Sequence, residues 1–170
     1  MNDEEKLSGI NFGQDVSFIR DNHLFRLRAA AIILRDHHVL MARNQRNSYY
    51  YSIGGAVHLG ESLQDALRRE VLEETGLDLP IMRLVAVHQN FFHDAEMGRQ
   101  FWHEIAFYYL MDYQGQPLKH TGSLSMLDIP ETLHWLPLDS YAAYKAYPRF
   151  FQDLPALLKQ DAPAQIITRE

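Results

Sequence analysis

One amphipathic segment, residues 63–75, constrains the fold of this chain more than any other part of the sequence. It reads LQDALRREVLEET, has apolar residues at helical spacing and contains neither proline nor glycine. Ser62 before it suits an N-cap, and Gly76 after it suits the left-handed position that ends many helices. The pattern therefore predicts a helix from Leu63 to about Thr75.

Three glutamates gather on one side of this predicted helix. Glu70, Glu73 and Glu74 stand at positions i, i+3 and i+4, a spacing that places them on a common face. An advance of about 100° per residue brings that face into line with the apolar stripe that begins at Leu63. We therefore expect the carboxylates to point toward the protein body rather than into solvent.

Carboxylates in that position need an opposite charge, because burying them unpaired costs free energy. Arg69 can pair with Glu73 one turn further on, but it cannot neutralise all three glutamates. A hard divalent cation, which binds through oxygen ligands, can do so. The spacing alone thus favours a cation site over a solvated helix surface.

Strands are predicted on both sides of this helix. They fall at residues 16–20, 25–34, 39–43, 49–53, 81–92, 101–111 and 133–138. The second and third strands read as one hairpin, and the strands at 81–92 and 101–111 as another. Residues 140–160 look helical, with breaks near Pro148 and Pro155.

This order of elements predicts an α/β domain with a mixed β-sheet. We place that single domain at residues 16–160. Residues 1–15 are expected to form an N-terminal tail, and residues 161–170 a frayed C-terminal tail.

Composition limits the chemistry that the chain can perform. It has 170 residues and no cysteine, which excludes disulfides and thiolate metal sites. Its net charge of −6 disfavours binding to a nucleic-acid polymer, and a phosphate-bearing substrate would need local cations. No apolar run reaches the ~18 residues of a membrane span, and the start, MNDEEKLSG, lacks the features of a signal peptide. We therefore expect a cytoplasmic protein that does not associate with membranes.

Extended upstream, the predicted helix becomes part of a longer motif, GAVHLGESLQDALRREVLEETGL, at residues 55–77. This segment resembles the Nudix box, G-x5-E-x7-R-E-U-x-E-E-x-G-U, in which U is a bulky aliphatic residue. The fixed positions are all filled, by Gly55, Glu61, Arg69, Glu70, Glu73, Glu74 and Gly76, with Val71 and Leu77 as the aliphatic residues. The family often has Leu-Pro-Gly-Gly before the box, whereas this chain has SIGG at residues 52–55 and keeps the glycine pair.

The resemblance to Nudix hydrolases implies an α/β/α sandwich that hydrolyses a nucleoside diphosphate linked to a further group, with Mg²⁺ or Mn²⁺. It implies that Glu70, Glu73 and Glu74 bind the metal together with the Gly55 carbonyl. It also implies that Arg69 orients these carboxylates through charge-assisted hydrogen bonds. A cation suits the reaction because it neutralises the anionic diphosphate and polarises the P–O bond.

Residues outside the box helix are expected to complete the site. Glu104 interrupts an apolar strand, so it either faces solvent or points at the glutamate cluster, where it could bind metal or activate water. Glu61 is either a distal ligand or a structural partner near the start of the helix. The candidates for substrate binding are Arg43, at a strand end, and the aromatic residues Tyr51, Phe91 and Phe92.

Several alternatives remain open at this point. ADP-ribose-like compounds, dinucleoside polyphosphates and nucleoside triphosphates all fit the resemblance as substrates. The main alternative function is a Nudix domain that senses nucleotides without cutting them. An isomerase of the same fold is disfavoured because that chemistry commonly uses a cysteine. Family members often dimerise, so a homodimer is a further option.

Overall fold

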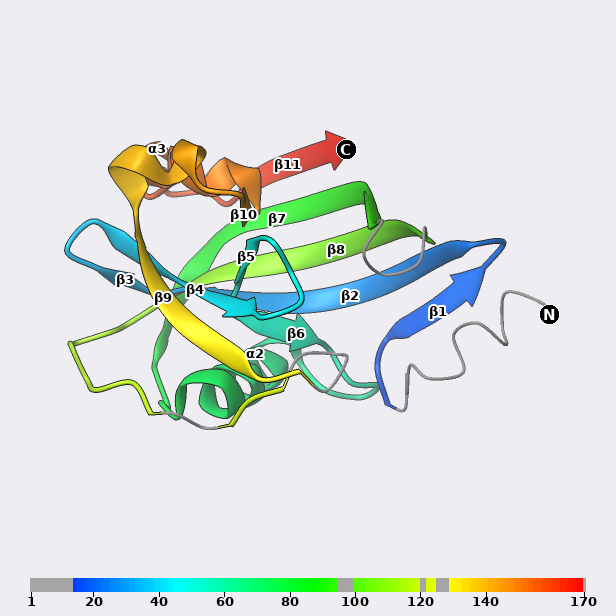
Figure 1. Cartoon of the computed structure of the whole chain (residues 1–170), viewed down its shortest axis with the longest axis horizontal. Helices are drawn as coiled ribbons and strands as arrows, with labels where there is room; N and C mark the ends of the chain where they lie inside the picture. Colours follow the sequence, from blue (N-terminus) through cyan, green and yellow to red (C-terminus); the bar gives the residue numbers. More distant parts are fainter. Residues whose placement is uncertain (1–13, 95–99, 120–121, 125–128, 170) are drawn as a thin grey trace.

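The computed structural model describes residues 14–94, 100–119, 122–124 and 129–169, which form two β-sheets flanked by helical segments (Figure 1). The larger sheet has the order β1 (Ser17–Arg20), β2 (His23–Ile32), β8 (Gln100–Met111), β7 (Ile81–Asp94) and β11 (Ala164–Arg169), with β6 (Gly54–Ala56) also paired to β2. The smaller sheet has the order β10 (Ala146–Tyr147), β5 (Tyr50–Ser52), β4 (His38–Asn44) and β3 (Leu34–Arg35), with β9 (Glu131–Pro137) paired to β4.

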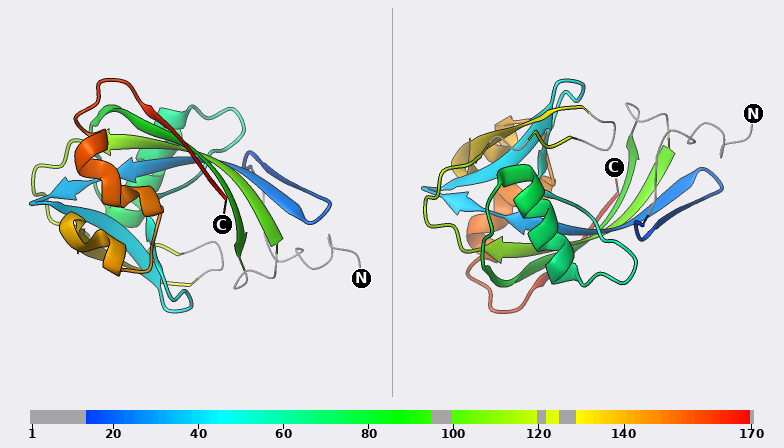
Figure 2. Two further views of the ribbon diagram at one scale, coloured as in Figure 1. Left: turned by 90° about the horizontal axis from the view of Figure 1, so that it is seen from above. Right: turned by 90° about the horizontal axis from the view of Figure 1, so that it is seen from below.

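The helical segments lie on opposite sides of these sheets. They are α2 (Leu63–Thr75), the short 3₁₀ helices η1 (Leu138–Ala143) and η2 (Arg149–Asp153), and α3 (Leu154–Leu157). Figure 2, with its views from above and below, places α2 on one side and the C-terminal segments on the other. Sequence elements before and after α2 therefore meet in one layered domain.

The larger sheet is mixed, as the sequence predicts. β2 runs parallel to β8, β8 runs antiparallel to β7, and β7 runs parallel to β11. The predicted hairpin of β7 and β8 is confirmed. The predicted hairpin of residues 25–34 and 39–43 is wrong over most of its length, because only the short β3 pairs with β4 in the smaller sheet, whereas β2 pairs with β8 in the larger one.

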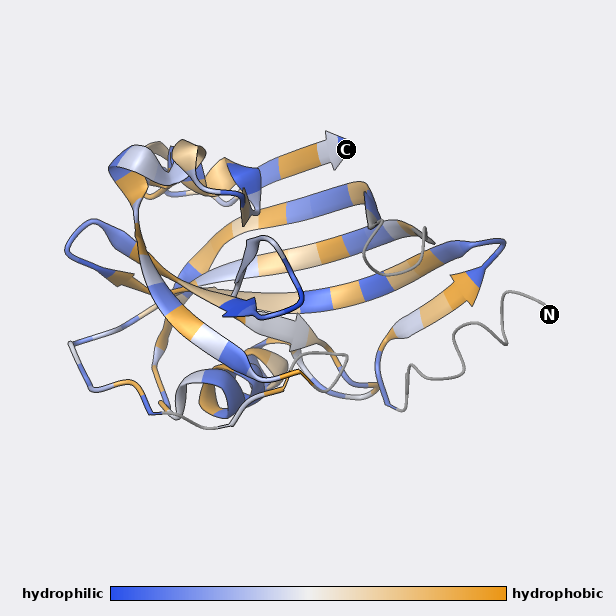
Figure 3. Ribbon diagram, viewed as in Figure 1, coloured by the Kyte–Doolittle hydropathy of each residue, from blue (hydrophilic) through white to orange (hydrophobic). Residues whose placement is uncertain are grey.

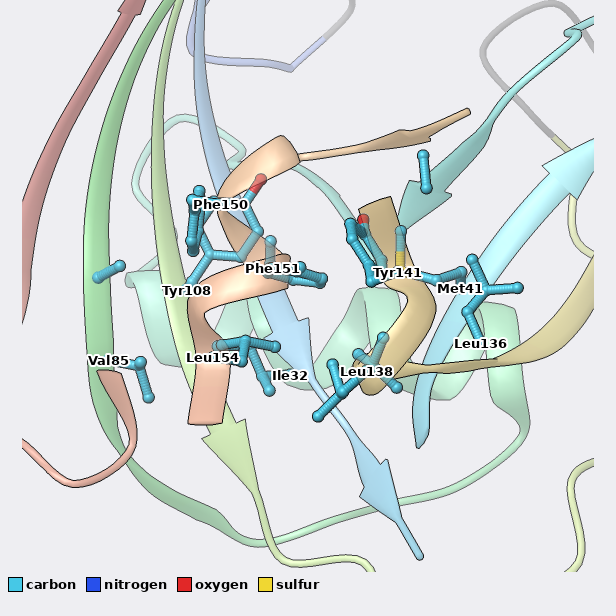
Figure 4. Close-up of a cluster of buried hydrophobic side chains, with 14 of the residues drawn as sticks. Ile32, Met41, Val85, Tyr108, Leu136, Leu138, Tyr141, Phe150, Phe151 and Leu154 are labelled. Atoms are coloured by element: carbon cyan, nitrogen blue, oxygen red, sulfur yellow. The ribbon is translucent and has the colours of Figure 1, made fainter. Parts of the chain in front are cut away.

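Two hydrophobic cores separate the layers. Side chains alternate along β2, so Ala30 and Ile32 face one core while Ala29 and Ala31 face the other. Figure 3 shows bands of hydrophobic and hydrophilic residues along the strands of the larger sheet. The first core, drawn in Figure 4, joins this sheet to the C-terminal segments through residues that include Tyr108, Phe151 and Leu154. The second core joins the sheets to α2.

The expected helix at residues 140–160 is wrong. The chain there forms η1, the short strand β10, η2 and the single turn of α3. Pro148 explains the main break, since it has no N–H to donate and restricts the preceding residue to extended conformations. Tyr147 accordingly lies in β10, which pairs in parallel with β5.

The expected frayed tail at residues 161–170 is also wrong for residues 164–169. They form β11, which pairs with β7 from Ala164↔Ala86 to Arg169↔Phe91. The alternating sequence AQIITR, with its β-branched residues, is typical of an edge strand.

The predicted N-terminal tail lies largely outside the described residues, because the description begins at residue 14. At its end, Asp15 forms a β-bridge with His58. Within the described ranges, no helix has the length and apolar character required to cross a membrane.

The two isoleucines of β11 test whether this strand contributes to stability. Ile166 packs against the first core, whereas Ile167 is 63% exposed. We expect Ile166→Ala to lower the free energy of unfolding by roughly 1–2 kcal/mol, less than a fully buried isoleucine would lose. Ile167→Ala should change it by less than about 0.5 kcal/mol. Thermal unfolding followed by circular dichroism measures both, and equal effects would show that β11 does not pack as described.

Candidate functional site

Helix α2 begins and ends at the residues that the sequence indicates. The Ser62 hydroxyl accepts a hydrogen bond from the Asp65 N–H at 3.1 Å. Gly76 adopts a left-handed conformation, with φ +70°, and donates its N–H to the Leu72 carbonyl at 2.9 Å. These caps fix the direction and register of the helix, and so the positions of its glutamates.

The three glutamates differ in exposure. Glu74 is 8% exposed and Glu70 is largely buried, but the side chain of Glu73 is 57% exposed. The expectation of three inward carboxylates is thus correct for Glu70 and Glu74, while Glu73 lies at the rim.

The Gly54–Gly55 turn packs directly against the two buried carboxylates. Gly54 donates its N–H to Glu74 Oε1 at 2.8 Å. Its φ of +128° suits glycine alone, and a Cβ there would lie 2.3 Å from the Ala29 carbonyl oxygen. A Cβ on Gly55 would lie 2.5 Å from the carboxyl group of Glu70. The glycine pair therefore allows the backbone to approach both glutamates.

The guanidinium group of Arg69 contacts several of the carboxylates. Its Nε and Nη2 donate to the two carboxylate oxygens of Glu61, each at 2.9 Å, and its Nη1 donates to Glu70 Oε1 at 2.6 Å. Glu73 Oε2 lies 3.7 Å from Nη1. The hydrogen bond from Arg69 holds the pKa of Glu61 at about 2. Glu61 is therefore ionised and forms a salt bridge with Arg69 near the start of the helix.

Burial raises the pKa of both inward glutamates. For Glu74 burial is the largest cause and the charge of Glu131 adds to it, so the pKa lies well above its ordinary value despite the Gly54 N–H. For Glu70 burial again dominates, even though Arg69 donates to it. A nearby cation would oppose this effect, because it favours the ionised form of a carboxylate.

A cavity of about 600 Å³ opens beside these groups. The predicted site residues that line it are Gly55, Glu70, Glu73, Glu74, Glu104, Tyr51 and Phe92. The helix, the glycine turn and the strands β5, β7 and β8 therefore converge on one volume. The cavity is large enough for a nucleotide-sized molecule.

Besides Glu61, three predicted site residues do not line this cavity. Arg69 contacts the glutamates from the side, as described above. The Arg43 guanidinium lies over the Tyr50 ring, 5.2 Å from its centroid. Phe91 stacks on His103 at 4.4 Å, on the face of the sheet opposite to Phe92, since neighbouring residues of a strand point to opposite faces.

Glu104 points into the protein and is only 3% exposed, so it is not the solvent-facing strand residue that was one of the two expectations. Its Oε2 accepts from Arg26 Nε at 2.8 Å and also from Arg26 Nη2. Burial raises the pKa of Glu104, but the charges of Arg26 and Arg28 together outweigh it, and the pKa lies below its ordinary value. The carboxylate is therefore ionised and paired.

Glu131 is a site residue that the sequence did not indicate. It lines the cavity from β9, accepts from the Tyr51 hydroxyl at 2.5 Å and accepts from Ser123 Oγ at 2.8 Å. Burial, together with the hydrogen bond to Glu131, raises the pKa of Tyr51, so the phenol remains a neutral donor.

Arg28 and Trp102 also line the cavity and were missed. Trp102 stacks on Phe92 at 5.4 Å, and the Arg26 guanidinium lies 4.8 Å above the Trp102 ring. The alternation of arginines with apolar residues in FRLR, residues 25–28, would put Arg26 and Arg28 on one face of a strand and could have indicated Arg28.

These features define an α/β domain whose box helix presents carboxylates to a nucleotide-sized cavity. The sequence matches the NUDIX domain family over residues 24–154. The chain therefore belongs to the Nudix hydrolase family.

Individual relatives agree with this assignment. The chain is 32% identical over 90 residues to the NAD-capped RNA hydrolase NudC of Photorhabdus laumondii, a stretch covering 52% of this chain and 32% of that protein. The chain thus spans about a third of the length of the curated relative it matches.

Solved structures support the fold. The MutT NUDIX hydrolase from Burkholderia pseudomallei is 28% identical with a TM-score of 0.53, covering 68% of this chain and 84% of that one. The MutT protein from Methanosarcina mazei Go1 superimposes with a TM-score of 0.60 at 23% identity, covering 80% and 96% of the two chains. The predicted α/β class and Nudix fold are confirmed.

The raised pKa of Glu74 predicts how the stability of the metal-free protein depends on pH. A carboxyl whose pKa is raised by folding stabilises the fold while protonated, and this contribution is lost as pH rises from its ordinary pKa, near 4.5, through the raised value. Glu74→Gln stays neutral and can still accept from Gly54. In EDTA at pH 8 we expect it to melt above the unaltered protein, by about 2–4 °C per kcal/mol gained.

Glu73→Gln is the matched control, because the Glu73 side chain is 57% exposed and its replacement should move the melting temperature little. Melting curves collected from pH 5 to pH 8 make the comparison. Parallel curves for Glu74→Gln and the unaltered protein would contradict the burial of charge at this position.

Proposed function

We propose that this protein is a metal-dependent pyrophosphohydrolase that cuts a nucleoside diphosphate linked to another group by attack of water at phosphorus. The observation that carries the proposal is the burial of Glu70 and Glu74 against the Gly54–Gly55 turn at the wall of the cavity. Family membership supports the same reaction class.

The donor chemistry of this wall fits a hard divalent cation such as Mg²⁺ or Mn²⁺. Carboxylate and carbonyl oxygens are the ligands that these ions prefer, and two of the glutamates have pKa values raised mainly by burial. Glu70, Glu73 and Glu74 would hold the ion with the Gly55 carbonyl. As they lie in the described part of the chain, no three His, Asp or Glu side chains are close enough together to hold a metal ion.

When bound, the cation would neutralise the diphosphate and polarise the bond that is cut. The protein itself would orient the metal ligands and exclude water from them. Arg69 fixes Glu70 through a charge-assisted hydrogen bond and keeps Glu61 ionised beside it. Glu74 is held by Gly54, so both buried ligands are oriented before substrate arrives.

The aromatic part of the cavity lining suits a nucleoside. Phe92 and Trp102 form a stacked pair there, and Tyr51 and Asn90 also line the cavity. An aromatic surface with a few polar groups is typical of nucleotide sites. ADP-ribose-like compounds, dinucleoside polyphosphates and nucleoside triphosphates fit this description, and the name of the Photorhabdus laumondii relative adds NAD-capped RNA to the set.

A panel of these four substrate classes with Mg²⁺ or Mn²⁺ tests the proposal. We expect hydrolysis of at least one, with a loss of at least ~100-fold in Glu73→Gln and in Glu74→Gln, since even outer groups of a metal site contribute 10–100-fold. Asp78→Asn, an exposed carboxylate just beyond the helix, is the control and should keep full activity. Tight nucleotide binding without any hydrolysis would instead favour a sensing domain.

Glu131 is our candidate for the group that takes the proton from water. Its described hydrogen bonds to side chains come from two neutral hydroxyls, whereas Glu104 is paired with an arginine that lowers its basicity. Glu131→Gln should lower kcat by about 10²–10⁴ and remove the acid limb of the pH–rate profile.

Tyr51→Phe provides the comparison for Glu131→Gln, because it removes one hydrogen bond and leaves the carboxylate in place. We expect it to lower kcat by less than about tenfold, the free-energy equivalent of one typical hydrogen bond. If Glu131→Gln keeps both the height and the shape of the profile, the proton acceptor is another residue.

A further inference from the structure

A buried arginine connects the larger sheet to the glycine turn of the site. Arg28, on β2, is 9% exposed, and its Nη2 donates to the Ser52 carbonyl at 2.6 Å and to the Gly54 carbonyl at 3.0 Å. The N–H of Gly54 donates in turn to Glu74. Gly54 is therefore fixed on both sides, by a cation at its carbonyl and by a carboxylate at its N–H.

The buried charge of Arg28 is offset by a carboxylate on the next strand. Burial opposes the charged form of Arg28, but nearby acidic groups, of which Glu104 has the largest effect, outweigh it and raise the pKa of the guanidinium. The register of β2 and β8 explains the proximity, because Arg26 stands opposite Glu104 and Arg28 lies on the same face two residues further along.

The hydrogen-bond pattern allows the charge of Glu104 to act on both Arg26 and Arg28. Both donors of Arg26 go to Glu104 Oε2. Among the described residues, Arg28 Nε has no hydrogen-bond acceptor, so the pairing of Arg28 with Glu104 is through charge. The Glu104 carboxylate is therefore hydrogen-bonded to Arg26 and interacts by charge with Arg28, and all three residues line the cavity.

We propose that Arg28 and Glu104 are a positioning pair for the metal ligands: Glu104, on the neighbouring strand, offsets the buried charge of Arg28, and Arg28 holds the Gly54–Gly55 turn against Glu74. Glu104 then acts through Arg28 and does not itself take a proton from water. The role of the pair in hydrolysis rests on the proposed function, but its effect on the turn, and so on metal binding, does not.

The first test measures Mn²⁺ binding without substrate, by electron paramagnetic resonance of the free ion. Arg28→Met removes the donor to both carbonyls, and we expect it to weaken Mn²⁺ binding by about 10–100-fold, the usual effect of losing a group that orients metal ligands. Arg28→Lys keeps a charge and one donor, so it should recover part of this loss. Arg68→Met, at an exposed position of α2, controls for the loss of one positive charge.

The second test combines Glu104→Gln with Arg28→Met. Because Glu104 acts through Arg28, the double variant should bind Mn²⁺ about as well as Arg28→Met alone, and independent effects that multiply would overturn the proposal. The proposal is also overturned if both Arg28 variants bind Mn²⁺ like the unaltered protein. If Arg28→Met is unfolded at the assay temperature, as shown by its melting curve, Arg28→Lys and Glu104→Gln provide the same comparison.

The third test separates positioning from proton transfer. A positioning role predicts that Glu104→Gln lowers kcat by the same factor at every pH, whereas loss of a general base removes one limb of the pH–rate profile. Disappearance of that limb would overturn the proposal. If the unaltered protein cuts no substrate, yet Mn²⁺ binding falls in Arg28→Met, the proposed hydrolase function fails and the positioning pair stands.

Discussion

The hydrogen bond between the Gly54 N–H and the buried Glu74 carboxylate is the contact on which the rest of the site depends. It is possible only because Gly54 has a positive φ and no side chain, which lets β6 approach β2 and α2 together. The caps at Ser62 and Gly76 then set the helix so that Glu74 meets this turn. The conformation that glycine allows and the packing of β2, β6 and α2 therefore favour the same position for the Gly54 peptide group.

The charged residues that line the cavity are unevenly distributed. The helix side carries carboxylates, two of which are buried, and the sheet side carries Arg26 and Arg28 around the single carboxylate of Glu104. A diphosphate ester needs cations near its oxygens and oriented acceptors around the attacking water. A cation on the carboxylate side and arginines on the other would place positive charge on both sides of the substrate, in a protein whose net charge is −6.

The sequence predicted the helix and the placement of Glu70 and Glu74 toward the protein body well because their determinants are local. Capping residues, apolar spacing and the box motif all lie within residues 54–77, and side chains one helical turn apart must share a face. Glu73 is more exposed than predicted because periodicity gives the direction of a side chain but not how far the neighbouring layer extends over it. The prediction of a helix over residues 140–160 failed because Pro148 interrupts an otherwise helical composition, while Pro155 lies in the first turn of α3.

Contacts between strands could not be predicted in the same way. Arg26, Arg28 and Glu104 come together through the register of β2 and β8, which are 78 residues apart where Arg26 meets Glu104. Glu131 reaches Tyr51 because β9 and β5 both pair with β4 in the smaller sheet, a topology that periodicity does not specify. Such residues have no local signature, because one polar side chain in a strand fits a solvated face as well as a buried site.

The difference between Glu104 and Glu131 shows why position in a cavity does not by itself assign a role. Both are carboxylates that line the same volume, but one faces two guanidinium groups and the other accepts hydrogen bonds from two hydroxyls. A cationic neighbour stabilises the ionised form of Glu104 and weakens it as a base, whereas the two hydroxyls that donate to Glu131 carry no charge. The partners of each carboxylate, rather than its distance from the substrate, therefore separate a group that orients the backbone from one that can exchange a proton.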